Sequence, residues 1–82
     1  MDKKSIFLAI QKSVLLIMDG VDEKQIQKSD SLKSLGANSI DRAEIIMLTL
    51  ENLNIRIPMI DFAQAKNIDD ICNIIYDKYQ TK

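Results

Sequence analysis

The residue best placed for covalent chemistry is Ser39, in segment 35–41, which has the sequence LGANSID. Gly36 gives this segment the conformational freedom to present a hydroxyl group. A serine becomes a nucleophile when a neighbouring base activates it. The chain contains no histidine, and no Gly-x-Ser-x-Gly motif surrounds Ser39. The sequence therefore predicts a serine that another enzyme modifies, rather than one that attacks a substrate.

Ser39 also stands where an irregular segment gives way to a helical pattern. A serine or asparagine at such a position is most often an N-cap, so Asn38 or Ser39 could simply cap the helix. The functional alternative is attachment of a phosphodiester. The unpaired N–H groups and the positive dipole end of a helix N-terminus favour a phosphate there.

Composition excludes several classes of function. The absence of histidine removes a Ser-His-Asp triad and the usual zinc ligand, and the single cysteine excludes an intramolecular disulfide. Cys72 falls in an apolar helical stripe, which predicts a core residue. The 12 acidic and 11 basic residues are scattered, with no basic arm for nucleic acid. We therefore expect no catalytic residue, no metal site and no nucleic-acid partner.

The elements that position Ser39 are predicted to be helices of one all-α domain, residues 1–82. Apolar residues recur with helical period from Lys3 to about Asp19, and Leu15 is expected to widen the buried stripe. Gln11, Lys12 and Ser13 interrupt the apolar run, and no small-residue cleavage site follows. The segment is thus interpreted as a mature helix of a cytoplasmic protein rather than a signal peptide.

The remaining chain predicts a long loop, a second helix, a short helical turn and a last helix. The loop covers 20–38, and the second helix runs from Ser39 to Leu53 before Pro58 blocks further helix. The short turn is expected near residues 60–65. The last helix begins after Asn67 as its cap. The fold class is therefore a small four-helix bundle of three main helices and one short helix.

The second helix is apolar on two sides. Projection at 100° per residue places one apolar group on the core face: Ile45, Ile46, Thr49 and Leu53. The opposite face alternates apolar and acidic side chains: Ile40, Glu44, Met47 and Glu51, with Ala43 beside them. Apolar groups supply desolvation and carboxylates supply steering, so this face suits partner docking. Scattered surface hydrophobes are the ordinary alternative.

These features together resemble an acyl carrier protein. The resemblance rests on segment 35–41, the helix after it and Ile57-Pro58, and it covers essentially the whole chain. It implies that Ser39 carries 4′-phosphopantetheine, whose thiol holds an acyl thioester. It also implies that the second helix and the preceding loop, from Asn38 onward, form the recognition surface. A phosphopantetheinyl transferase is the implied modifying partner.

Segments 38–47 and 63–68 resemble a narrower group, the free-standing donor carriers of polyketide β-branching cassettes. This sequence departs from the commonest Asp-Ser-Leu pattern of acyl carrier proteins by having Asn38 and Ile40. Arg42 also reduces the acidity expected at the start of the second helix. The likeness implies a malonyl group loaded by an acyltransferase and converted to acetyl by a decarboxylating ketosynthase-like enzyme. The acetyl group then passes to a synthase resembling hydroxymethylglutaryl-CoA (HMG-CoA) synthase. We expect a monomer that binds no membrane.

Other functions stay open at this point. The chain could be a carrier of fatty-acid synthesis, or an aminoacyl or peptidyl carrier loaded by an adenylating enzyme. It could also be an unmodified helical adaptor, with Ser39 serving as a cap. A hydrolase or transferase is disfavoured, because only carboxylates are available as bases near pH 7.

Overall fold

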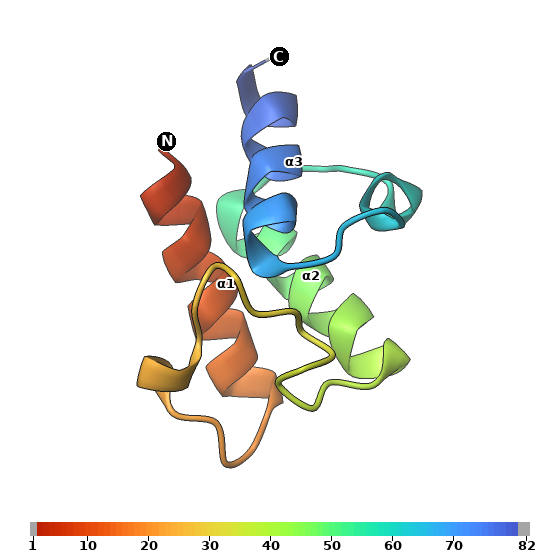
Figure 1. The fold of residues 1–82 in the computed structure, drawn as a ribbon. Coiled ribbons are helices and arrows are strands. Elements are labelled where there is room, and N and C mark those ends of the chain that lie inside the picture. The colour runs from red at the N-terminus through yellow and green to blue at the C-terminus, as the bar shows by residue number, and fades with distance from the viewer. Residues whose placement is uncertain (1, 81–82) are drawn as a thin grey trace.

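Three α-helices form the fold of the computed structural model, which describes residues 2–80 (Figure 1). α1 spans Lys3–Ile17, α2 spans Ser39–Leu53 and α3 spans Ile68–Gln80. Two short 3₁₀ turns lie between them, η1 at Glu23–Gln25 and η2 at Met59–Phe62. The predicted all-α class is confirmed, with η2 as the short helix. The additional turn η1 was not predicted.

α1 packs against both other helices and runs in the opposite direction to α3 beside it (Figure 1). Its first turn is capped by Asp2, whose Oδ1 accepts a hydrogen bond from the Ser5 N–H at 2.8 Å. The prediction for Leu15 was wrong, because this side chain is 39% exposed. Leu15 lies nine residues beyond the buried Ile6, and nine steps of 100° place it about 180° around the helix from that side chain.

A buried pair of hydroxyl groups joins α1 to α2. Ser13 and Thr49 are both fully buried. Oγ1 of Thr49 lies 2.8 Å from Oγ of Ser13 and 2.8 Å from the carbonyl oxygen of Ile45. Ser13 in turn donates to the carbonyl oxygen of Ala9 at 3.0 Å. The single proton of Thr49 thus has two acceptors, Oγ of Ser13 and the carbonyl oxygen of Ile45, and neither hydroxyl lacks a hydrogen-bond partner in the core.

The core around this pair is apolar and receives side chains from all three helices. Its fully or almost fully buried helical members are Ile6, Ile10, Val14, Ile45, Ile46, Leu50, Ile68, Ile71, Cys72 and Ile75. Leu53, expected on the core face, packs against this cluster while partly buried. Cys72 is a core residue, as predicted.

The long loop between α1 and α2 is fixed by its own buried side chains and by hydrogen bonds to α3. Ile26 and Leu32 are buried. The N–H of Ile68 donates to the carbonyl oxygen of Asp30 at 2.8 Å, and that of Asp69 donates to the carbonyl oxygen of Lys28 at 2.9 Å. These bonds satisfy first-turn N–H groups of α3 that have no intrahelical partner. The loop therefore approaches α2 from a defined position (Figure 1).

Within residues 2–80, none of the helices has the length and apolar character needed to cross a membrane.

The buried hydroxyl pair gives a test of the core. We expect Thr49→Val and Ser13→Ala each to lower the free energy of unfolding by about 1 kcal/mol, since each removes a buried hydrogen bond. The double variant should lose less than the two single losses together, because the hydrogen bond between the two hydroxyl groups is counted in both single losses but can be lost only once. Urea unfolding of the four proteins measures this coupling. Ser29→Ala, at an exposed position, is the control and should change the free energy of unfolding by less than about 0.5 kcal/mol. If the losses of the two single variants simply add up in the double variant, the two hydroxyl groups are not coupled.

Candidate functional site

Ser39 is the first residue of α2, and Asn38 is the cap of that helix. Oδ1 of Asn38 accepts a hydrogen bond from the Asp41 N–H at 2.8 Å, and Oδ2 of Asp41 accepts one from the Asn38 N–H at 3.4 Å. This reciprocal arrangement is a capping box. Because Asn38 takes the capping role, the exposed hydroxyl of Ser39 is left outside the cap. The interpretation of Ser39 as the cap is therefore wrong.

The approach to Ser39 depends on Gly36. Its φ of +101° lies in the region that L side chains rarely adopt, so a glycine suits this turn. The next residue, Ala37, is buried, and its N–H donates to the carbonyl oxygen of Leu32 at 3.1 Å. The chain thus turns at Gly36, anchors at Ala37 and delivers Ser39 to the surface.

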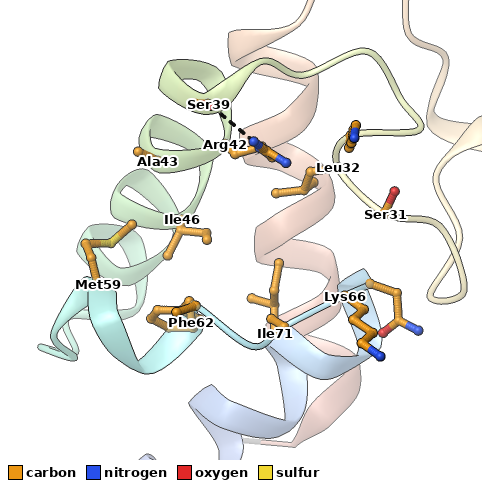
Figure 2. Close-up of a pocket in the computed structure, with 14 residues that line it drawn as sticks. Ser31, Leu32, Ser39, Arg42, Ala43, Ile46, Met59, Phe62, Lys66 and Ile71 are labelled. Atoms are coloured by element: carbon orange, nitrogen blue, oxygen red, sulfur yellow. Dashed lines mark hydrogen bonds between the residues drawn. The ribbon is translucent and has the colours of Figure 1, made fainter.

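A guanidinium group lies beside the Ser39 hydroxyl. Nη2 of Arg42 donates to Oγ of Ser39 at 3.2 Å (Figure 2). A guanidinium has only N–H donors and no acceptor atom, so Arg42 cannot take the serine proton. The neighbour of Ser39 is thus a cation rather than a base, which suits an anion attached to the serine. Sequence reasoning considered only the charge of Arg42, although its spacing of three from Ser39 is the signal for helical neighbours.

A cavity of about 500 Å³ opens next to Ser39, between α2, η2, the start of α3 and the long loop (Figure 2). Buried apolar side chains of Ile46, Phe62 and Ile71 line it. Arg42 and two exposed cations, Lys33 and Lys66, also line it. The space beside the serine is therefore apolar inside and positively charged near solvent.

Four of the predicted partner-binding side chains share one exposed face of α2. Ile40 is 69% and Met47 58% exposed, and Glu44 and Glu51 are exposed with them. Asn38 lies at the helix start, as the cap. Ala43 does not point outward with this group; it is half-buried and lines the cavity beside Ser39.

Sequence reasoning missed an apolar extension of this face. Met59 and Ile60, at η2, are 38% and 79% exposed. A groove of about 480 Å³ lies between α2 and the segment after it, with Met47, Arg56 and Met59 among its lining residues. The signal in the sequence was the apolar pair directly after Pro58, of which Ile60 was predicted only as the start of the short helical turn.

Cys72 cannot contribute a reactive thiol to this site. Its side chain is fully buried, and burial, followed by the nearby charge of Asp69, raises the pKa of the thiol from its ordinary 9.0 to about 11. A thiol in this state is protonated near neutral pH and is a poor nucleophile. Within residues 2–80, no cluster of three or more histidine, cysteine or acidic side chains could hold a metal ion.

The sequence of the chain is similar to one known protein family and to individual members of it. A family model described as a phosphopantetheine attachment site matches residues 15–75, more than half of the chain. The chain is 38% identical over 81 residues to the polyketide biosynthesis acyl-carrier-protein AcpK of Bacillus subtilis (strain 168), and the match covers 99% of each protein. It is 32% identical over 79 residues to an acyl carrier protein of Guillardia theta, covering 95% of this chain and 96% of that protein.

A solved structure has the same fold. The chain superposes with a TM-score of 0.87 and 37% identity on a chain in the crystal structure of the curacin biosynthetic pathway HMG synthase in complex with acetyl donor-ACP. The superposition covers 95% of this chain and all of that chain.

The burial of Cys72 predicts slow thiol modification in the folded protein. Because the pKa rises from 9.0 to about 11, the thiolate fraction at pH 8 is about 100-fold lower than in the unfolded chain. Ellman's reagent should therefore react far more slowly with the protein in buffer than in denaturant. The rate for the folded protein should keep rising with pH up to about 11, whereas the rate in denaturant levels off above 9. Equal rates in the two conditions at pH 8 would contradict the burial.

Proposed function

Because this chain belongs to the acyl carrier proteins, the family with a phosphopantetheine attachment site, we propose that 4′-phosphopantetheine is joined to the Ser39 hydroxyl. The observation that carries this proposal is the exposed Oγ at the start of α2, outside a cap that Asn38 already completes. Acyl carrier proteins hold acyl groups as thioesters on this arm and are not enzymes.

The attachment chemistry is a phosphoryl-group transfer from coenzyme A. Oγ of Ser39 forms a bond to the phosphorus atom of the pantetheine phosphate, the pyrophosphate bond breaks, and 3′,5′-ADP leaves. The serine proton passes to a base of the phosphopantetheinyl transferase, since the neighbour of Oγ in this chain is a guanidinium. The positive end of α2 lies where the new phosphodiester carries its negative charge.

The cargo and its destination form the second part of the proposal. The similarity to a polyketide carrier and to a chain crystallised with an HMG synthase supports a role in polyketide β-branching. In this role the arm receives malonyl from an acyltransferase, and a decarboxylating ketosynthase-like enzyme converts it to acetyl with loss of carbon dioxide. The carrier then delivers acetyl to an HMG-CoA synthase-like enzyme. Residues 1–82 act as one monomeric carrier domain in the cytoplasm.

The exposed face of α2 is the proposed docking surface for this synthase. Ile40 and Met47 offer apolar area, and Glu44 and Glu51 place carboxylates beside them. Apolar contacts gain from desolvation, whereas exposed carboxylates mainly steer a basic partner and fix its register. Asn38 and Ala43 flank this face at its Ser39 end. A partner bound here therefore lies next to the attachment serine.

The attachment proposal is tested by the mass of the modified protein. Incubation with coenzyme A and a phosphopantetheinyl transferase should add one arm to the natural chain and none to Ser39→Ala, because that variant lacks the accepting oxygen. Ser34→Ala is the matched control, since Ser34 is another exposed loop serine, and it should be modified like the natural chain. Modification of Ser39→Ala to the same yield would refute the assignment.

The docking proposal is tested by acyl transfer to the synthase. Glu44→Lys and Met47→Glu should each slow transfer, because the first repels a basic partner and the second removes apolar contact area. Both side chains are exposed, so the free energy of unfolding should change by less than about 0.5 kcal/mol. Glu23→Lys and Leu16→Glu make the same changes at exposed positions elsewhere and should leave transfer unaltered. Unchanged kinetics with the α2 variants would exclude this face.

A further inference from the structure

Arg42 contacts the Ser39 hydroxyl directly and does more than add to the positive charge of the surface around it. Its guanidinium already contacts the hydroxyl, at 3.2 Å, and its side chain is half-buried at the edge of the cavity (Figure 2). Within the described residues, the recorded ion pair joins Lys78 to Asp61, and Arg42 forms no ion pair with an acidic side chain. The charge of Arg42 is thus available for an anion at Ser39.

We propose that Arg42 binds the phosphodiester once the arm is attached and so holds the first part of the arm on the cavity side of α2. This inference rests on the proposed attachment at Ser39. It assigns Arg42 as a positioning residue of the carrier, acting on the prosthetic group that the carrier bears.

Attachment of the arm changes which oxygen atoms beside Arg42 are good hydrogen-bond acceptors, and this change favours a contact between Arg42 and the phosphodiester. Oγ of Ser39 becomes an ester oxygen, which is a weaker acceptor than a hydroxyl oxygen. The non-bridging oxygens on the same phosphorus atom carry the negative charge and lie directly beside Oγ, within reach of a guanidinium that already contacts it. Hydrogen bonds between a guanidinium and a phosphate are charge-assisted and can be bidentate. Partial burial of the Arg42 side chain reduces screening by solvent.

The direction of the arm follows from the helical positions of the residues around it. Arg42 and Ile40 are two residues apart, which separates them by about 200° around α2. Arg42 therefore lies on the cavity side, with Ile46 one turn further along and Phe62 across the cavity (Figure 2). Ile40 lies on the proposed docking face. A phosphodiester bound to Arg42 places the geminal methyl groups of pantetheine near the apolar lining and leaves the docking face uncovered.

Nuclear magnetic resonance of protein whose mass shows one arm per chain tests this contact. Using only modified protein separates a failure of the contact from a failure of attachment. In the natural chain, the Arg42 Nε–H signal should shift between the unmodified and modified forms. The geminal methyl groups of the arm should show NOEs to Ile46 or Phe62. The ³¹P resonance of the phosphodiester should differ from that of the same modified chain unfolded in urea, and it should move toward that value as salt is added, because screening weakens the contact.

The variant Arg42→Gln and its matched control Arg56→Gln complete the test. Arg56 is exposed and lines the other groove, away from Ser39. In Arg42→Gln the NOEs from the arm should fall about threefold or more, and the ³¹P resonance should lose most of its salt dependence. Arg56→Gln should match the natural chain. The proposal is overturned if attachment of the arm leaves the Arg42 Nε–H signal of the natural chain unchanged, and this measurement needs no variant. It is also overturned if the NOEs from the arm are identical in Arg42→Gln and the natural chain.

Discussion

The capping box at the start of α2 is the interaction on which the rest of the site depends. Asn38 and Asp41 satisfy each other's backbone N–H groups, at 2.8 and 3.4 Å. If Ser39 had to cap the helix, its hydroxyl would be held by the backbone and could not accept a bulky group without loss of the cap. Placing the cap one residue earlier separates helix stability from modification. The first residue of α2 can therefore carry an arm while the helix behind it stays intact.

The helix that starts there serves both the core and the surface. Ile45 and Thr49 are fully buried, and the hydroxyl of Thr49 fixes α2 against Ser13 of α1. Such a directional contact sets the rotation of α2 about its axis more strictly than apolar packing does. The rotation in turn decides which side chains face solvent. The outward position of Ile40 and Met47 is thus a consequence of contacts made on the opposite side of the helix.

Sequence patterns predicted α2 well because its signals are local. The asparagine cap, the apolar spacing and Pro58 fall within one short segment, and the predicted bounds of Ser39–Leu53 match the structure. The burial of Ser13 was missed because it depends on Thr49, which is 36 residues away in the chain. The turn η1 has a local signal, the Asp22–Gln25 capping box, although the predicted pattern did not include it. The cavity beside Ser39 was beyond local patterns, because four separate segments line it.

The charges around α2 are divided between its two sides, and this division matches the two ligands proposed for it. The cation of Arg42 lies toward the cavity with Lys33 and Lys66, whereas Glu44 and Glu51 lie on the exposed face. An anionic phosphodiester is attracted to the first side and repelled by the second, and a basic partner shows the opposite preference. An evenly acidic helix start would repel the phosphodiester from both sides. The arginine that makes this carrier less acidic therefore gives its prosthetic arm a preferred side.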